Sequence, residues 1–425
     1  MIAVVDCNNF FVSCELVFHP ELKGHPVMVA SNNDGCIVAR SPEVKALGIP
    51  MGAPAYQWKD LIRQHDIKIF SGNFALYGDL SKRVMQILLQ AAPTVEIYSI
   101  DEAFLEFPSL TNEMIISICK NLRSRLLQST GIPVSIGIGK TKTLAKIAVE
   151  IAKKNSEFQG VFSAESDKFD SFLAHMPTSD IWGIGRKLSE RLKCFGIYTA
   201  KDLKQAQDII IRKCTHLPGI RTTYELRGIK CIELQTAHSS RKGITASRSF
   251  GHPVSTYTEM AEAIALYTTR AAERLRSDKS IASWIQICIV TNYFRKDQKQ
   301  YVGFDSGLLL QPTAVTSEII KTAHILLKRI FKEGFIYKKA IVNLGGITPA
   351  SQQQISMLAD IKTSQRLSRL MTAVDKINRK AGRNKIHYAS CGILKKKSWH
   401  PKSEMLSRRY TTSWQELPVV KAIYS

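Results

Sequence analysis

Three carboxylates in two separate stretches of the sequence have the residue types and the setting of a metal site. Asp101 and Glu102 are adjacent and lie between two short apolar stretches, a pattern that predicts a strand, a turn and a strand. Asp6 follows the apolar run that opens the chain, which is typical of a buried strand. Carboxylates this close repel one another unless a cation lies between them. A solvated acidic turn is the alternative for the adjacent pair, and the second acid upstream favours the metal site.

Acids on two neighbouring strands would hold hard divalent cations. Mg²⁺ prefers carboxylate oxygens and completes its coordination with water and substrate phosphates. Two such ions roughly 3.5–4 Å apart serve phosphoryl transfer, because they stabilise both the attacking and the leaving oxygen. We therefore expect Asp6, Asp101 and Glu102 to hold two Mg²⁺ ions for a phosphoryl-transfer reaction.

The first 107 residues alternate short strands with helices, which indicates an α/β or α+β core around the acids. Apolar periodicity predicts a helix over 73–92, which Pro93 ends, and another over 111–128. Strands are expected at 2–6, 26–30, 36–39, 67–70, 95–98, 102–107 and 133–138.

A basic turn over 137–146 opens a further helix. It resembles a Walker A loop superficially, but the G-x-x-x-x-G-K-[ST] spacing is absent, which argues against a P-loop NTPase. Lys146 and Lys153 are seven residues apart in this helix and therefore share one of its faces. The spacing leaves two alternatives open for that face, contact with phosphate or exposure to solvent.

The second half of the chain is strongly basic. Residues 1–236 carry 28 Lys and Arg against 24 Asp and Glu, a net charge of +4, whereas residues 237–425 carry 31 against 12, a net charge of +19. This split indicates a polyanion-binding module. Nucleic acid fits better than an anionic membrane, because no basic amphipathic helix has a wide apolar face.

The order of elements expected over 247–345 is β-α-β-β-α-β, the ferredoxin-like order. The tail that follows has few hydrophobic positions apart from a helix near 365–378, a composition consistent with partial disorder or with folding on a partner.

Upstream, we expect residues 170–230 to form a compact helical segment. Its G-x-G turn at 183–185 would expose backbone amides that hold a DNA phosphate without reading bases.

The remaining composition points to the cytoplasm. The nine cysteines include no C-x-x-C pair and no His cluster has zinc spacing, so they are interpreted as reduced thiols. No apolar run approaches the ~18 residues of a membrane span. The chain opens with a strand and not with a secretion signal, so we expect a cytoplasmic protein without a membrane partner.

Several motifs together resemble the Y-family translesion DNA polymerases, and within them the UmuC branch, the catalytic subunits of bacterial DNA polymerase V and their plasmid-borne relatives. The family motifs are residues 6–11, 99–102, 142–153 and 182–185, and residues 32–36 and 408–412 resemble that branch specifically. The resemblance covers essentially all 425 residues. It implies an error-prone DNA polymerase that extends a primer opposite damaged bases during the SOS response.

The resemblance also implies an α+β multidomain fold shaped like a right hand. The palm would comprise residues 1–17 with 78–165, the fingers 18–77 and the helical thumb 166–235. A linker over 236–245 would lead to the ferredoxin-like little finger, 246–345, and the basic C-terminal region would be 346–425. The C-terminal region contains a pentapeptide similar to the glutamine-led peptides that dock on the sliding clamp, namely Gln354, Ile355, Ser356, Met357 and Leu358. For the rest of that region the resemblance implies contacts with a UmuD′-type dimer and a recombinase filament.

Site residues can be carried over from the motifs that match. Asp6, Asp101 and Glu102 match the family's metal-binding and catalytic acids, with the Cys7 backbone carbonyl as a further metal ligand. The substrates implied are primed template DNA and deoxynucleoside triphosphates. Residues matching triphosphate-binding positions are Lys45 and Lys153, and those matching DNA-binding positions are Gly183, Gly185, Arg186 and Arg248.

Phe11 falls at the family's steric gate, five residues after Asp6. A ring packed under the sugar leaves no room for a ribose 2′-oxygen. Many relatives carry Tyr there, so the bulk is kept and a hydroxyl is lost. The alternative is a core aromatic on the helix after the first strand.

Two other functions remain open from the sequence. A metal-dependent nuclease would use the same acids on water, but no His or Lys general base stands beside the acid pair in the sequence, and the gate aromatic would have no purpose. A DNA-binding protein without activity would not need all three acids. Adding nucleotides to a primed template separates the three, because the outcomes are extension, degradation or neither.

Overall fold

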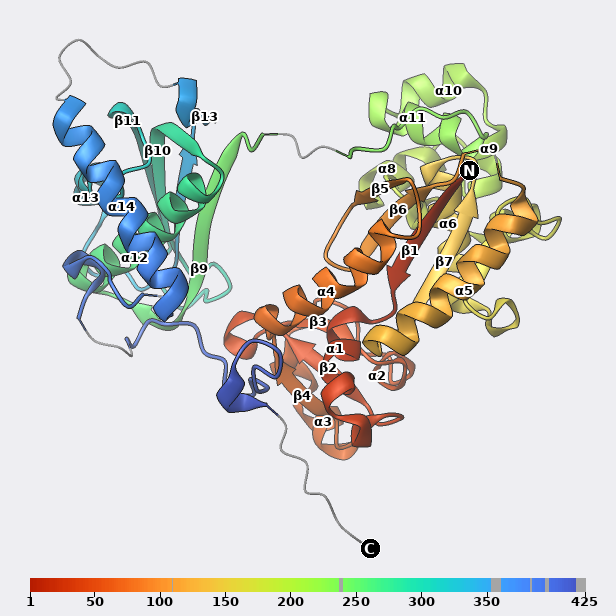
Figure 1. Cartoon of the computed structure of the whole chain (residues 1–425), viewed down its shortest axis with the longest axis horizontal. Coiled ribbons are helices and arrows are strands. Elements are labelled where there is room, and N and C mark those ends of the chain that lie inside the picture. Colours follow the sequence, from red (N-terminus) through yellow and green to blue (C-terminus); the bar gives the residue numbers. More distant parts are fainter. Residues whose placement is uncertain (109, 237–239, 353–360, 383, 394–396, 418–425) are drawn as a thin grey trace, which may run out of the picture. The chain divides into compact units, whose positions relative to one another are not determined.

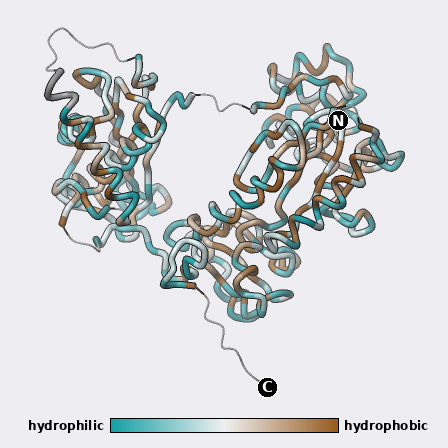
Figure 2. The backbone as a smooth tube through the Cα atoms, in the orientation of Figure 1, coloured by the Kyte–Doolittle hydropathy of each residue, from teal (hydrophilic) through white to brown (hydrophobic). Residues whose placement is uncertain are grey.

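The chain folds into two compact units. The computed structural model describes residues 1–108, 110–236, 240–352, 361–382, 384–393 and 397–417. Unit 1 consists of Met1–His238 together with Glu404–Ser425, and unit 2 consists of Ser239–Ser403. The chain therefore passes from unit 1 to unit 2 and returns to unit 1 (Figure 1). Figure 2 shows hydrophobic stretches inside both units and hydrophilic stretches mostly on the outside.

Unit 1 is built on a five-stranded sheet with the order β5-β6-β1-β7-β8. Its neighbouring strands are antiparallel except for β7 and β8, which are parallel. The strands agree with those expected from the sequence, apart from a short additional one at the β8 edge. Their bounds are β1 (Ile2–Cys7), β5 (Thr94–Ile97), β6 (Glu102–Glu106), β7 (Val134–Gly139) and β8 (Val161–Ser163).

Alternating side chains of this sheet enter two different cores. Ile2 and Val4 of β1 pack with Ala145 and Val149 of α6 (Lys142–Lys154). Their neighbours on β1 belong to the opposite core, which is covered by α4 (Phe74–Leu89) and α5 (Asn112–Thr130) (Figure 1). Because helices cover both faces, β1 is a continuous apolar run from Ile2 to Val5 and does not alternate with polar residues.

Two glycines let α6 approach β7 closely. A Cβ on Gly137 would lie 2.1 Å from the backbone nitrogen of Val149 and 2.2 Å from the carbonyl oxygen of Ala145. A Cβ on Gly139 would lie 2.7 Å from the Cβ of Leu144 and 2.8 Å from the backbone nitrogen of Ala145, in the first turn of the helix. Gly137 and Gly139 therefore permit the close packing of the helix on the sheet.

The rest of unit 1 flanks this sheet. Helix α1 (Phe10–Phe18) leads from β1 to a small sheet with the order β3-β2-β4. A group of short helices shares a core with α6 farther along the chain. The bounds of these elements are β2 (Val27–Ala30), β3 (Ile37–Arg40), α2 (Pro42–Ala46), α3 (Lys59–Gln64), β4 (Lys68–Ser71), α7 (Phe169–His175), α8 (Arg186–Lys193), α9 (Ala200–Gln205), α10 (Asp208–Cys214) and α11 (Leu217–Leu226).

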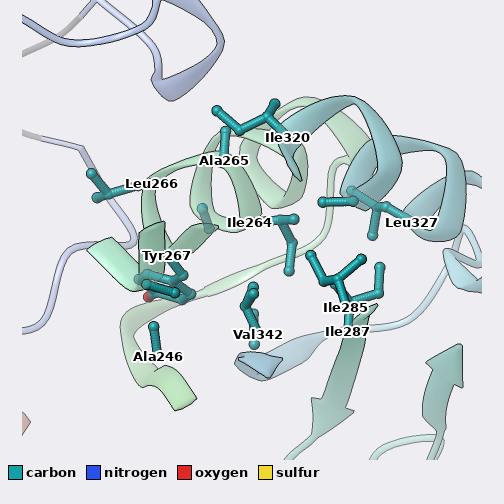
Figure 3. Close-up of a cluster of buried hydrophobic side chains, with 14 of the residues drawn as sticks. Ala246, Ile264, Ala265, Leu266, Tyr267, Ile285, Ile287, Ile320, Leu327 and Val342 are labelled. Atoms are coloured by element: carbon teal, nitrogen blue, oxygen red, sulfur yellow. The ribbon is translucent and has the colours of Figure 1, made fainter. Parts of the chain in front are cut away.

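Unit 2 has the expected β-α-β-β-α-β order. Its antiparallel sheet has the strand order β11-β10-β12-β9, and both helices lie on one face. Figure 3 shows Ile264 and Leu327, one from each helix, pointing toward Ile285 and Val342 of the sheet. The bounds are β9 (Gly243–Val254), α12 (Tyr257–Ser277), β10 (Ser280–Thr291), β11 (Val302–Thr313), α13 (Thr316–Ile330) and β12 (Tyr337–Gly345).

The described part of the basic tail contains regular elements and two residues that pack in hydrophobic cores. It contains a short strand, β13 (Thr348–Pro349), and α14 (Ile361–Ala381), which includes the helix expected near 365–378. Trp399 is 1% exposed in the core of unit 2, and Tyr410 is 8% exposed in the core of unit 1. The pentapeptide 354–358 lies outside the described residues. In the described part of the chain, no helix is both long and apolar enough to cross a membrane.

Candidate active site

Strand pairing brings the three predicted acids together. Asp6 of β1 lies in register with Glu102 of β6, and the amide of Cys7 donates a 2.9 Å hydrogen bond to the carbonyl oxygen of Asp101. The turn before β6 is held by Ser99, whose hydroxyl donates to Asp101 Oδ1 at 2.5 Å. The expectation of adjacent strands is confirmed for Asp6 and Glu102, and Asp101 lies in the turn that precedes β6.

The site disfavours uncompensated negative charge. Burial raises the pKa of Asp6, and the nearby Asp101 and Glu150 add to the rise, while Lys153 opposes it. Burial likewise raises the pKa of Glu102; Lys146 opposes this rise and Asp6 adds to it. Carboxylates in this situation are stabilised in their charged form by additional cations.

Two lysines of α6 provide part of that compensation. Lys153 Nζ lies 2.8 Å from Asp6 Oδ2 and 2.9 Å from Glu150 Oε1. Lys146 Nζ lies 2.5 Å from the Glu102 carboxylate. The shared helix face inferred from their spacing is thus turned toward the acids. The sequence marked Lys146 by this spacing but did not identify it as a site residue.

The acids fit divalent cations by their donor chemistry. Carboxylate oxygens, with the Cys7 carbonyl beside them on β1, are the hard ligands that Mg²⁺ prefers. Over the described residues, no three His, Cys, Asp or Glu side chains gather closely enough to form a complete metal cage. The ammonium groups of Lys146 and Lys153 lie beside Glu102 and Asp6 instead. For the acids to bind metal ions, Lys146 and Lys153 would have to release at least one oxygen of the carboxylates that they contact.

Lys45 reaches the same region from α2. Its Nζ donates to Asn9 Oδ1 at 2.5 Å. Burial lowers the pKa of Lys45, and the positive charges of Arg40 and Lys153 lower it further. The two lysines predicted to bind triphosphate are therefore close enough to repel each other, which favours an anion between them. Arg40 and Asn9 were not identified from the sequence.

Phe11 lies at the start of α1 and is half-buried. Its ring stacks on Tyr77 with the centroids 4.6 Å apart and an interplanar angle of 16°, and it meets the edge of Phe74 at 5.8 Å. The Tyr77 hydroxyl donates to Glu15 Oε1 at 2.7 Å. The residues that support the Phe11 ring were not identified from the sequence, although Glu15 shares a helix face with Phe11 at the i, i+4 spacing.

The predicted DNA-binding residues lie in both units. Gly183 has a positive φ of 86°, and Gly185 is the N-cap of α8, so the G-x-G turn precedes a helix as expected. Both glycines and Arg186 are exposed. Arg248 lies in β9 of unit 2, half-buried, and donates to the carbonyl oxygen of Ser247 at 2.8 Å. Their contact with DNA remains a prediction.

Family models match four segments of the chain. The impB/mucB/samB family matches residues 5–150, its C-terminal domain matches residues 241–357, and the IMS family HHH motif matches residues 166–197. A domain of unknown function, DUF4113, matches residues 368–420.

The chain is similar to curated proteins over its full length. It is 39% identical to Protein UmuC of Salmonella typhimurium over 424 residues, which is 99% of this chain and 100% of that protein. It is 38% identical to Protein SamB of the same organism, with the same coverage. A DNA polymerase IV of Desulfatibacillum aliphaticivorans is 27% identical, covering 89% of this chain and 93% of that protein.

A solved structure shares the fold. A Y-family DNA polymerase chimera, Dbh-Dpo4(243-245)-Dbh, superposes with a TM-score of 0.64 at 22% identity. The match covers 82% of this chain and 99% of that one.

Proposed function

The chain belongs to the impB/mucB/samB family of Y-family translesion DNA polymerases, and we propose that Asp6, Asp101 and Glu102 are its catalytic acids. It is a DNA-directed DNA polymerase of the error-prone, translesion kind that acts in the SOS response. The observation that carries the assignment of the acids is the register of Asp6 with Glu102, with Asp101 in the turn beside them.

The reaction is attack of the primer 3′-oxygen on the α-phosphorus of the incoming deoxynucleotide. The bond from the α-phosphorus to the bridging oxygen breaks, and pyrophosphate leaves. Y-family polymerases depend on divalent metal ions. We propose that the three acids and the Cys7 carbonyl hold two Mg²⁺ ions. These ions would lower the pKa of the primer 3′-hydroxyl and neutralise the negative charge of the leaving pyrophosphate.

The cations of the site would bind the triphosphate. Lys153 and Lys45 lie close enough for their charges to interact, and a triphosphate bound to both relieves their repulsion. Lys153 now contacts Asp6, so it would exchange that carboxylate for a phosphate oxygen when nucleotide and metal bind. Lys146 would likewise yield one oxygen of Glu102 to the metal ions, while its contact with the other oxygen orients that acid.

The domain boundaries that we propose are those of the right hand. The palm comprises residues 1–17 with 78–165, the fingers 18–77, the thumb 166–235 and the little finger 246–345, joined by the linker 236–245. The G-x-G turn of the thumb, at Gly183 and Gly185, would bind a DNA phosphate through backbone amides. The net charge of +19 over residues 237–425 would hold the duplex without reading its sequence.

The partners that we propose follow from the full-length similarity to Protein UmuC. They are a UmuD′-type dimer and a recombinase filament for the C-terminal region, and a sliding clamp for residues 354–358. Template DNA and deoxynucleotides are the substrates of the polymerase reaction. We infer a cytoplasmic location because that is where a bacterial polymerase meets chromosomal DNA.

Primer extension across an abasic template tests the proposal. The parent chain is compared with Asp101→Ala and with Asp167→Ala, an exposed acid outside the site, with and without the three partners. We expect extension by the parent and by Asp167→Ala, and none by Asp101→Ala. The metal ions that the three carboxylates hold would contribute several kcal/mol of transition-state stabilisation. The extension rate of Asp101→Ala should therefore fall on the order of 10³-fold or more. Degradation of the primer would indicate a nuclease, and binding without extension in every mixture would refute the polymerase site.

A further inference from the structure

The C-terminal segment Glu404–Glu416, here called the strap, packs against unit 1 beside the small sheet. Met405 and Ser71 are joined by two hydrogen bonds: the Ser71 amide donates to the Met405 carbonyl oxygen at 2.8 Å, and the Met405 amide donates to the side-chain Oγ of Ser71 at 3.0 Å. Leu406 forms a parallel bridge with Ser71 at the end of β4. The strap thus continues the edge of the sheet formed by β3, β2 and β4.

Side chains of unit 1 hold the strap in place. Asn73 is 3% exposed, and its Nδ2 donates to the carbonyl oxygens of Ser407 and Arg408, each at 3.3 Å. Asp34 accepts from the amide of Glu404 at 3.0 Å. The two motifs that resemble the UmuC branch specifically, residues 32–36 and 408–412, therefore both take part in this contact.

An aromatic residue anchors the far part of the strap. Tyr410 stacks on Phe18 of α1 with the ring centroids 4.5 Å apart and an interplanar angle of 8°. Its hydroxyl lies 2.9 Å from His19 Nε2. Burial of a ring of this size makes the strap an integral part of the unit 1 core.

The strap reaches the gate aromatic through one buried carboxylate. Ser407 Oγ donates to Glu15 Oε1 at 3.1 Å, and the Tyr77 hydroxyl donates to the same oxygen at 2.7 Å. Glu15 and Tyr77 are both 0% exposed. Since Tyr77 stacks on Phe11, a continuous path of contacts runs from Ser407 through Glu15 and Tyr77 to the gate ring.

We propose that the strap is a specificity element of the polymerase, in which Ser407, Glu15 and Tyr77 are positioning residues that hold Phe11 against the sugar of the incoming nucleotide. The inference rests on the proposed role of Phe11 as the steric gate. A gate works by bulk at a defined position, and misplacement of a reacting group or its support by about 1 Å can change a rate by as much as 10²-fold. Two hydroxyls on one carboxylate oxygen fix the Tyr77 ring, and the ring in turn fixes the plane of Phe11.

The test measures the ratio of kcat/KM for a ribonucleotide to that for the matching deoxynucleotide. The full chain is compared with Ser407→Ala, Tyr77→Phe and Glu15→Gln, and with Arg409→Ala as the matched strap control. Arg409 is exposed and pairs with Glu416 of the strap itself, away from Glu15. Glu15→Gln keeps an oxygen that accepts from both hydroxyls, so it serves as the conservative variant.

We expect the ratio to rise by roughly 3- to 10-fold in Ser407→Ala and Tyr77→Phe, the effect of losing one hydrogen bond of typical strength. Glu15→Gln and Arg409→Ala should retain the ratio of the parent. In a Phe11→Ala background, Ser407→Ala should have no further effect on the ratio, because the ring that Ser407 helps to position is then absent. A merely structural role would lower both kcat/KM values together and leave the ratio unchanged.

The outcomes separate the two proposals. If Phe11→Ala raises ribonucleotide use but Ser407→Ala and Tyr77→Phe leave the ratio unchanged, the gate stands and the role of the strap is refuted. If Phe11→Ala itself leaves the ratio unchanged, both proposals are refuted. Additive effects of Ser407→Ala and Phe11→Ala would show that the strap acts on selectivity by a route other than Phe11, which also overturns the inference.

Discussion

Asp6 and Glu102 face each other in register across β1 and β6, and each of them contacts a lysine of α6. Buried like charges in paired strand positions are unfavourable on their own, as the raised pKa values of both carboxyls indicate. The geometry therefore gathers negative charge at the place where we propose that divalent cations bind. A fold stabilised only by packing would place apolar residues at these two positions.

The gate assignment predicts a change in sugar selectivity. Phe11→Ala should raise the kcat/KM for ribonucleotides roughly 10- to 100-fold relative to deoxynucleotides, because removal of a ring relieves a steric clash of about 1–3 kcal/mol. Phe11→Tyr keeps the bulk and should retain the selectivity of the parent. Single-nucleotide incorporation kinetics with both sugars measures this, and equal selectivity in the parent and the Ala variant would mean that the ring does not contact the sugar.

Lys153 and its neighbour in the sequence provide a matched pair. Lys153→Ala should lower kcat/KM for deoxynucleotides about 10- to 100-fold, the effect of losing a charged hydrogen bond to phosphate. Lys154→Ala should have little effect, since its side chain is 64% exposed and lies 3.8 Å from its partner Asp180. Steady-state incorporation on undamaged template is sufficient. Similar losses in both variants would indicate a general effect of positive charge and not a triphosphate site.

The close packing of α6 on β7 predicts a stability effect at one glycine. Gly137→Ala should lower the free energy of unfolding by about 1–3 kcal/mol, because the added Cβ forces the helix backbone away from the strand. The shift would also displace Lys146 and Lys153, so activity should fall as well. Gly78→Ala is the control: it lies in α4 with nothing within 4 Å of its added Cβ, and it should be neutral or stabilising by up to about 1 kcal/mol. Urea unfolding of the three proteins decides between these outcomes.

Glu15 makes the stability of the protein depend on pH. Burial raises its pKa above the ordinary value of 4.5, although the hydroxyls of Tyr77 and Ser407 oppose the rise. The folded state therefore prefers the protonated acid. The resulting gain in the free energy of unfolding is complete below the pKa of Glu15 in the unfolded chain and is lost as the pH rises through its pKa in the folded protein. The loss is about 1.4 kcal/mol for each unit by which these two pKa values differ.

Glu15→Gln should consequently be more stable than the parent at neutral pH, with a difference that shrinks as the pH falls toward 4.5. Glu21→Gln is the matched control, because the backbone and His19 lower the pKa of Glu21 and its substitution should have the opposite sign. Denaturant midpoints between pH 5 and 8 measure both. A constant difference over this range would show that the Glu15 carboxyl does not titrate with a raised pKa.

The acid trio and most strands of unit 1 could be predicted from the sequence. Apolar runs mark buried strands whatever surrounds them, and an acid at the end of such a run marks the strand end as a site. The shared face of Lys146 and Lys153 follows in the same way from helical periodicity. These features depend on neighbours along the chain, which a sequence displays directly.

The tertiary structure alone decided which distant segments meet. Ser407 and Glu15 are separated by 392 positions and are joined by one hydrogen bond, and no local pattern marks either as the partner of the other. The Tyr77 ring, the Asn9 partner of Lys45 and the contact of Lys146 with Glu102 are likewise absent from any periodicity. They arise because burial in a packed core is satisfied collectively, so a polar group finds its partner from whichever element the fold brings beside it.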